Sequence, residues 1–315
     1  MPYDPMRSSM PAPIPALLAI DSHWLKQAPS TRTLLVVYAH PDDESFGNAG
    51  TLARYSAAGV AVHYVCATRG ECGTVAPGLL EGYADIAALR TAELICAART
   101  LGLTAVHFLG YRDSGMPGAA DNQHPHALVQ APRERVVGQI AALMRALHPH
   151  VVLTFGPYGG YGHPDHIAIH HATLAAFTAA GDPACYPEQL GAGLAPWAPQ
   201  KLYYATSGTR LFTIGTTLLR LTGKDPRRFG ENGDIDLVLA AAHTTPITTS
   251  IDCSAYLADK VRAWRCHRSQ LTNMDRIERL PGLLRRRFIG TEHFTRIVPP
   301  WNGQRARERD LFAGL

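Results

Sequence analysis

Short apolar runs alternate with stretches of helical periodicity along the first half of the chain. Largely apolar runs with the length of buried strands occupy residues 34–39, 60–67, 105–109 and 151–155. Before the last run, apolar residues recur at helical spacing from Val136 to Leu147. The alternation predicts an α/β fold with a Rossmann-like, mostly parallel sheet and helices on both faces.

The second half of the chain continues this pattern less regularly. Residues 202–206 and 247–251 are typical of strands, and an apolar stripe from Leu257 to Trp264 predicts a late helix. Residues 208–236 form an insertion rich in Gly and Arg. Because no repeat or low-complexity linker divides the chain, we expect one domain with a C-terminal elaboration.

The domain limits follow from composition. We expect a partly ordered, Pro-rich arm over residues 1–30, the domain over residues 31–300, and a C-terminal tail over residues 301–315. With 315 residues, of which 46% are hydrophobic and 18% charged, the chain can bury a sizeable core.

Charge, hydropathy and cysteine content limit which partners and which cellular compartment we expect. The net charge is only +4, and the Arg-rich C-terminal stretch lacks interleaved aromatic residues, so we expect no nucleic-acid partner. No apolar segment approaches the ~20 residues that span a bilayer, so we expect no membrane partner either. Six cysteines without a CxxC pair predict reduced thiols and a cytoplasmic protein. The sequence leaves the oligomeric state open, including a homo-oligomer.

Two clusters of imidazole and carboxylate side chains follow two of the predicted strands. His40-Pro41-Asp42-Asp43-Glu44 comes directly after residues 34–39, and Gly162-His163-Pro164-Asp165-His166 follows residues 151–155. Since open α/β sheets bind ligands at the carboxyl ends of strands, we expect both clusters at one edge of the sheet. A catalytic zinc takes three protein ligands and keeps one position for water. His40, Asp43 and His166 can supply that set.

The other side chains of the clusters fit the needs of hydrolysis. A base must take a proton from the attacking water, and an acid must protonate the leaving group. Asp42 and His163 are available for these roles, and Asp165 is placed to orient His163. Glu71 and Asp113 follow the second and third predicted strands, so we expect both to contact the site.

Each cluster alone has a simpler interpretation. The first fits an Asx turn with Asp43 as a helix cap, and a single His on a helix is more often packed or solvated than a ligand. Two such clusters, each after a predicted central strand, favour a metal site. His124-Pro125-His126 follows no predicted strand, and we expect an ordinary loop there.

Over residues 34–294 the sequence resembles the PIG-L/LmbE-like deacetylases, zinc enzymes that remove acyl groups from amino sugars and related amines. The resemblance is carried by the two clusters and by four shorter motifs, which are Arg69-Gly70-Glu71, Arg90-Thr91-Ala92-Glu93-Leu94, Tyr111-Arg112-Asp113-Ser114-Gly115-Met116 and His267-Arg268-Ser269-Gln270. It implies zinc bound by His40, Asp43 and His166, with Asp42 as general base. His163, with Asp165 behind it, would be the acid or the oxyanion stabiliser.

The resemblance also implies roles for residues outside this set. Tyr161 matches a residue that reaches the oxyanion in some relatives, and Glu71, Arg90 and Asp113 match positions that touch the sugar. Residues 208–236 are similar to stretches of the thiol-sugar branch, the mycothiol-pathway deacetylases and conjugate amidases. We therefore expect a zinc-dependent enzyme, with Fe²⁺ as the alternative metal, that hydrolyses an N-acetyl group of a small amino-sugar substrate.

Several alternatives stay open. An amidase acting on thiol-sugar conjugates would use the same site. Two His and one carboxylate also describe non-haem iron oxygenases, although the spacing and the α/β pattern fit that class poorly. A sugar-binding relative without activity would be expected to lose Asp42, which is present. A dinucleotide enzyme is disfavoured because no GxGxxG follows the first predicted strand. A structural zinc site is disfavoured because such sites have four protein ligands, most of them Cys.

Overall fold

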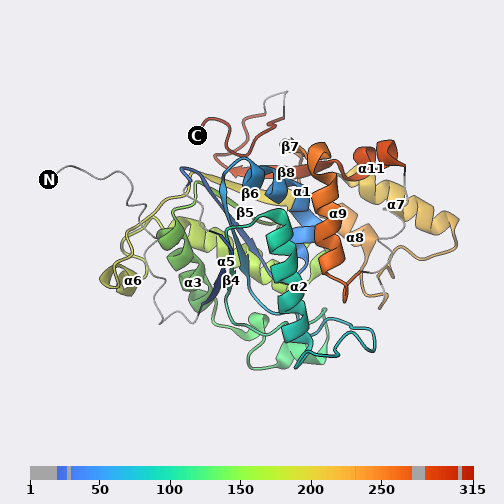
Figure 1. The fold of residues 1–315 in the computed structure, drawn as a ribbon, viewed down its shortest axis with the longest axis horizontal. Helices are drawn as coiled ribbons and strands as arrows, with labels where there is room; N and C mark the ends of the chain where they lie inside the picture. The colour runs from blue at the N-terminus through green and yellow to red at the C-terminus, as the bar shows by residue number, and fades with distance from the viewer. Residues whose placement is uncertain (1–19, 27–29, 231, 272–280, 304–306) are drawn as a thin grey trace.

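A computed structural model describes residues 20–26, 30–230, 232–271, 281–303 and 307–315 (Figure 1). In the described residues, eight strands form one sheet in the order β1-β4-β3-β2-β5-β6-β8-β7. The strands are β1 (Asp21–Trp24), β2 (Thr33–Tyr38), β3 (Ala61–Cys66), β4 (Ala105–Phe108), β5 (Val151–Phe155), β6 (Lys201–Thr206), β7 (Thr249–Asp252) and β8 (Thr291–Val298). The strands from β4 to β6 pair in parallel, whereas β1, β8 and β7 pair antiparallel. The prediction of a mostly parallel α/β sheet is confirmed.

The α-helices of the described chain follow the strands in βα alternation up to β6. They are α1 (Asp43–Ala57), α2 (Ile86–Leu101), α3 (Arg133–Leu147), α4 (Gly159–Gly162), α5 (Pro164–Ala179), α6 (Pro187–Gly191), α7 (Thr209–Leu221), α8 (Leu237–Ala242), α9 (Leu257–Cys266) and α11 (Gly282–Ile289). Short 3₁₀ helices are η2 (Ala120–Gln123), η3 (Leu128–Gln130) and η4 (Ser254–Tyr256). The stretch that holds His124 to His126 is a turn between η2 and η3, as expected for an ordinary loop.

Helices cover both faces of the sheet (Figure 1). In β2, Leu34, Val36 and Tyr38 pack in the core under α1 and α2, whereas Leu35 and Val37 pack in the core under α3 and α5. Because both faces are buried, β2 is buried at every position and is apolar from Leu34 onward instead of alternating. This burial explains why the central strands could be predicted from apolar runs in the sequence.

Two edge regions were not predicted. β1 lies within the expected N-terminal arm and pairs antiparallel with β4, and β8 inserts between β6 and β7. β8 mixes buried and half-exposed positions, so its sequence lacks an apolar run. The inserted residues 208–236 contain α7 and an isolated bridge between Phe229 and Ile235.

Strand β8 holds α1 in place through Glu292. Helix α1 departs from helical geometry at Asn48, and the backbone amides of Gly50 and Thr51 just beyond donate to the Glu292 carboxylate at 3.0 and 2.7 Å. Lys260 of α9 forms a buried ion pair with the same carboxylate at 2.5 Å. A Cβ on Gly50 would lie 2.5 Å from Cβ of Cys253, so only glycine allows this approach. The C-terminal part of the chain thereby fixes the helix that begins with Asp43.

The prediction of reduced thiols is wrong for one pair of cysteines. Cys96 of α2 and Cys266 of α9 form a disulfide, whereas Cys66, Cys72, Cys185 and Cys253 are free. Because α2 and α9 pack against each other, residues separated by 170 positions come to a Cα–Cα distance of 5.7 Å. No local spacing could reveal that pairing.

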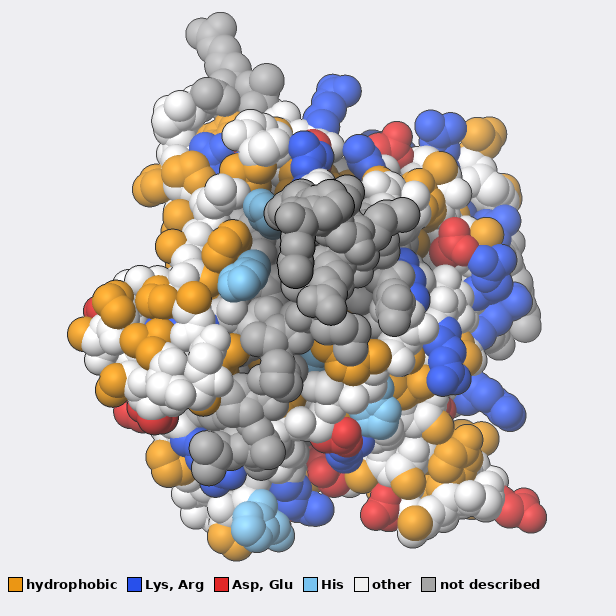
Figure 2. All heavy atoms as spheres, turned by 60° about the vertical axis from the view of Figure 1, so that its left-hand side comes forward, with side chains coloured by type: hydrophobic (Ala, Val, Ile, Leu, Met, Phe, Trp, Pro, Cys, Tyr) orange, Lys and Arg blue, Asp and Glu red, His pale blue; other side chains and the backbone are white. Residues whose placement is uncertain are grey.

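The surface has mixed character. On the face shown in Figure 2, basic side chains gather along the right-hand edge and are scattered elsewhere among hydrophobic, acidic, His and uncharged side chains. In the described residues, no helix is both long and apolar enough to cross a membrane.

Replacing Glu292 by Gln should destabilise the protein by about 3–5 kcal/mol, because Lys260 would keep a buried charge without a partner. Urea unfolding followed by circular dichroism measures the change. The double variant Lys260→Met/Glu292→Gln removes the orphaned charge and should recover part of the loss. A single variant as stable as the wild type would show that the ion pair does not hold α1.

Candidate metal centre

Three predicted ligands converge where two parallel strands end side by side. His40 and Asp43 follow β2, and His166 lies in the first turn of α5 after β5, the neighbour of β2. Nδ1 of His40 lies 3.0 Å from Nε2 of His166 and 3.7 Å from Oδ2 of Asp43, and Nε2 of His166 lies 3.3 Å from Oδ1 of Asp43. Their side chains are at most 10% exposed. The three donor groups therefore face one point.

The backbone between the ligands is fixed by Asp43 itself. Its Oδ2 accepts hydrogen bonds from the amides of His40, at 2.8 Å, and Ala39, at 3.2 Å. Asp42 adopts φ 118°, a conformation that is uncommon for a residue with a side chain and that turns the chain sharply into α1. Burial opposes ionisation of Asp43, but the adjacent His166 and His40 rings outweigh it and lower the pKa of Asp43.

The hydrogen-bond partners of each imidazole ring determine which of its two nitrogens is free to bind a metal. Nδ1 of His166 donates to the carbonyl of Gly159 at 2.9 Å, which leaves a lone pair on Nε2. Nε2 of His40 faces Oδ2 of Asp165 at 3.1 Å and Oδ1 of Asp113 at 3.5 Å, so its Nδ1 faces the same point as Nε2 of His166. Outer carboxylates and carbonyls orient metal-binding imidazoles in this way. Two nitrogen donors and a carboxylate facing one point suit a divalent cation such as Zn²⁺.

His163 adds a third imidazole to the cluster. One ligand atom each from His40, His163 and His166 can lie within 4.8 Å of the others, as can one each from His40, Asp113, His163 and Asp165. The buried His and Asp cluster is thus suited to a metal ion, and the geometry leaves His163 close enough to be an alternative ligand.

The carboxylate of Asp165 differs from its predicted placement. It contacts His40 and accepts from the amide of Ser114 at 3.0 Å, instead of supporting the ring of His163. Only the backbone amide of Asp165 reaches His163, by donating to Nδ1 at 3.2 Å. The reason is that His163 is the N-cap of α5 and Asp165 lies in the first turn of that helix. The amide of Asp165 therefore faces the ring of His163, while its side chain points toward the end of β2. The prediction that Asp165 orients His163 is therefore wrong for the side chain.

Asp42 is held by Arg90. Nη2 of Arg90 donates to Oδ2 of Asp42 at 2.9 Å, and its Nη1 donates to the carbonyl of Gly70 at 2.9 Å. A Cβ on Gly70 would lie 2.0 Å from Nη1, so glycine is needed where the guanidinium passes. Burial raises the pKa of Asp42 to about 6, and the Arg90 charge opposes the rise. Arg90, predicted to touch the sugar, is 3% exposed and contacts the predicted base directly.

His163 and Tyr161 line the same region. Because Nδ1 of His163 accepts the Asp165 amide, a neutral ring carries its proton on Nε2, which lies 3.9 Å from Oδ1 of Asp113. Burial and the His40 and His166 rings lower the pKa of His163. The ring of Tyr161, in α4, lies 5.0 Å from that of His166 and 6.1 Å from that of His163.

Glu71 and Asp113 lie at the ends of β3 and β4 as predicted. Glu71 accepts from the amide of Asp113 at 3.0 Å, and Asp113 accepts from the amides of Gly115, at 2.8 Å, and Cys72, at 3.3 Å. The two loops after these strands are therefore tied together beside the metal centre. Their contact with a sugar stays a prediction.

Sequence reasoning gave no role to Glu44 and His267, which form a buried ion pair at 2.6 Å. Oε2 of Glu44 accepts from the amide of Asp42 at 3.0 Å, so the pair supports the residue with the unusual backbone. Glu44 lies in the first cluster and His267 in the last motif, but nothing in either motif indicates that they meet. The pairing depends on α9 packing against α1.

Comparisons with known proteins were consistent with these observations. Residues 35–177 match the family model described as PIG-L, GlcNAc-PI de-N-acetylase. The chain is 36% identical over 302 residues to 1D-myo-inositol 2-acetamido-2-deoxy-α-D-glucopyranoside deacetylase of Streptomyces avermitilis, covering 92% of this chain and 99% of the relative.

Two solved structures share the fold. N,N'-diacetylchitobiose deacetylase from Pyrococcus horikoshii, complexed with its inhibitor MPG, is 22% identical with a TM-score of 0.58, and the match covers 85% of this chain and 84% of that one. GalB, the 4-carboxy-2-hydroxymuconate hydratase from Pseudomonas putida KT2440, is 19% identical with a TM-score of 0.54. That match covers 88% of this chain and 100% of GalB. Since a hydratase shares this architecture, the fold alone does not define the reaction.

Replacing His166 by Ala should weaken Zn²⁺ binding by more than about 100-fold, beyond the loss typical of removing an outer-shell partner. Competition with a chelator of known affinity measures the change. His171→Ala, an exposed position on the same helix, is the matched control and should bind zinc like the wild type. Equal zinc affinity in both variants would exclude His166 as a ligand.

Proposed function

The chain belongs to the PIG-L (GlcNAc-PI de-N-acetylase) family of deacetylases, and from this we propose that it hydrolyses the N-acetyl group of a glucosaminyl-inositol or a closely related small amino sugar. The observation that carries the proposal is the convergence of His40, Asp43 and His166 beside the half-buried carboxylate of Asp42. The name of the Streptomyces avermitilis relative, which aligns over nearly all of its length, supports the substrate class.

The proposed metal site consists of His40, Asp43 and His166. Zn²⁺ bound there would supply Lewis acidity and lower the pKa of a bound water to about 7. Asp113 and Asp165 would hold the ring of His40 in the tautomer that presents Nδ1.

Asp42 is the proposed general base. Its carboxylate lies beside the ligands, and its pKa of about 6 leaves it ionised at neutral pH yet close enough to pH 7 to take and release a proton. Arg90 fixes one carboxylate oxygen, so the other is the one available to the attacking water. The Glu44–His267 pair holds the backbone amide of Asp42 and is proposed to position it.

His163 is the proposed donor to the oxyanion. Its lowered pKa favours a neutral ring, and its Nδ1 bond to the Asp165 amide places the remaining proton on Nε2. A neutral imidazole of this kind can donate a hydrogen bond to charge that develops on the amide oxygen. Tyr161 is proposed to assist from the opposite wall, and the proton that Asp42 accepts can then pass to the departing amine.

Asp42→Asn should keep about one equivalent of zinc and lose at least ~100-fold in kcat, since general base catalysis contributes roughly that much or more. Release of free amine and acetate from N-acetylglucosaminyl-inositol measures activity, and elemental analysis measures zinc. Asp182→Asn, an exposed acidic position, is the matched control.

Full activity of Asp42→Asn would remove Asp42 as the base. A zinc-loaded wild type that binds the amino sugar but releases no amine would favour a sugar-binding relative without activity. Dependence of turnover on dioxygen and 2-oxoglutarate would favour an iron oxygenase instead.

A further inference from the structure

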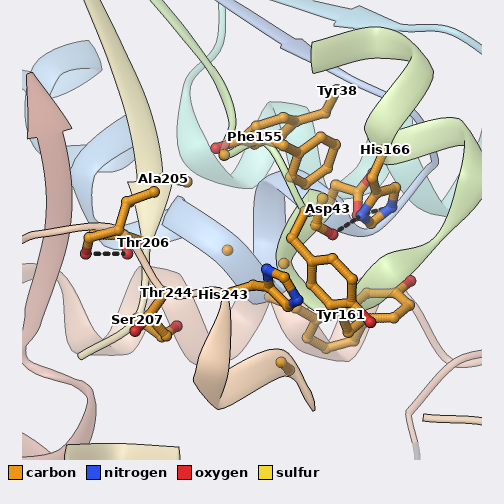
Figure 3. Close-up of a pocket in the computed structure, with 18 of the residues that line it drawn as sticks. Tyr38, Asp43, Phe155, Tyr161, His166, Ala205, Thr206, Ser207, His243 and Thr244 are labelled. Carbon is orange, nitrogen blue, oxygen red and sulfur yellow. Dashed lines mark hydrogen bonds and ion pairs between the residues drawn. The ribbon is translucent and has the colours of Figure 1, made fainter. Parts of the chain in front are cut away.

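A cavity of about 290 Å³ opens beside the metal centre (Figure 3). Asp43, Tyr161 and His166 form the wall that it shares with the metal site, and Ala205 and Thr206 lie across from them. The remaining walls come from the first turns of α1, the end of β5, and residues of α7 and α8. The inserted segment between β6 and β7 therefore closes this space.

The cavity and the predicted sugar contacts lie on opposite sides of the metal centre. Glu71 and Asp113 follow β3 and β4, whereas the cavity lies at the ends of β5 and β6. The metal ligands follow β2 and β5, between these two groups in the sheet order β4-β3-β2-β5-β6. An amide that lies across the metal with its sugar over β3 and β4 must direct its acyl group toward β6.

The cavity walls are chemically different from the sugar side. Phe46, Phe155 and Phe212 contribute aromatic surface, and Gly47 and Gly156 contribute no side chain. Among the described residues that line it, Asp43 is the one carboxylate, and there is no Lys or Arg. Such walls suit an uncharged, largely apolar group, because a charged group would lose its hydration without gaining a partner.

The size of the cavity exceeds what an acetyl methyl needs. A water molecule occupies roughly 30 Å³ in the liquid, so 290 Å³ can hold a chain of several methylene groups. An N-acetyl substrate would leave most of this space without a partner.

We propose that this space, called here the acyl cavity, binds the acyl group of the substrate, so that the enzyme hydrolyses amino-sugar amides with apolar acyl chains longer than acetyl. The inference depends on the proposed amide hydrolysis. Water adds its oxygen to the carbonyl carbon, the C–N bond breaks, and the products are a fatty carboxylate and the amine, which receives the proton.

The first test uses the wild-type zinc enzyme and a series of N-acylglucosaminyl-inositols with acetyl, butanoyl, hexanoyl and octanoyl groups. Between acetyl and hexanoyl, kcat/KM should rise about fourfold per methylene, the rate equivalent of the ~0.8 kcal/mol gained by burying one CH₂. Released amine is measured, so the assay does not depend on the acid product.

The second test fills the acyl cavity. Gly47 lies on α1, and a Cβ there would meet only Cε2 of Tyr38, at 4.0 Å, so the side chain of Gly47→Leu can extend into the cavity. This variant should lower kcat/KM for the hexanoyl amide at least 10-fold more than for the acetyl amide. Ala57→Leu, an exposed position on the same helix, is the matched control and should keep the wild-type ratio.

The outcomes separate the two proposals. If acetyl is hydrolysed well and longer acyl groups progressively worse, the acyl cavity is wrong while the deacetylase function holds. If no amide of the series releases amine from fully zinc-loaded protein, the proposed function fails and the inference fails with it. A rising series that Gly47→Leu flattens supports the inference.

Discussion

Nδ1 of His40 and Nε2 of His166 lie 3.0 Å apart, and the other nitrogen of each ring is already engaged. The contact between these two nitrogens is favourable when a proton on one of them is donated to the other, or when a metal ion lies between or beside them. Asp43 faces these two inner nitrogens, and Asp113 and Asp165 lie at the outer nitrogen of His40, so all three carboxylates favour such a charge. A positive charge at this point, whether a proton or a metal ion, thus accounts for the burial of so many acidic and imidazole groups at one sheet edge.

The parallel strands and the helices between them could be predicted because β2, β3, β4 and β5 are buried on both faces and therefore appear as apolar runs. The grouping of His40, Asp43 and His166 was also predictable, since the strands before them are neighbours in a parallel sheet. The partners of Glu44 and Asp165 were not, because they depend on how α9 and β4 pack against residues far away in sequence. The disulfide was missed for the same reason, whereas β8 was missed because its mixed burial leaves its sequence without an apolar run.

The site is asymmetric in its chemistry. On the side of β3 and β4, Glu71, Arg90 and Asp113 are charged and joined by hydrogen bonds to backbone amides or carbonyls. On the side of β6, the walls are mostly aromatic, small or hydroxyl-bearing, with Asn48 and His243 as further polar residues. A substrate that carries a polar and an apolar part on either side of one amide matches this division. The division follows the sequence only in part. The polar side is built before residue 120, whereas the cavity on the other side is lined by residues both before residue 170 and after residue 200.

The hydrogen bonds between Glu292 and helix α1 affect when, during synthesis, the proposed metal site can form. All three proposed ligands are translated more than 100 residues before Glu292, because His166 precedes it by 126 positions. Until then the amides of Gly50 and Thr51 lack their acceptor, and α1 is not yet anchored. A nascent chain would therefore contain the proposed ligands well before Glu292 can hold them in place, so firm capture of a metal ion would fall to the complete polypeptide.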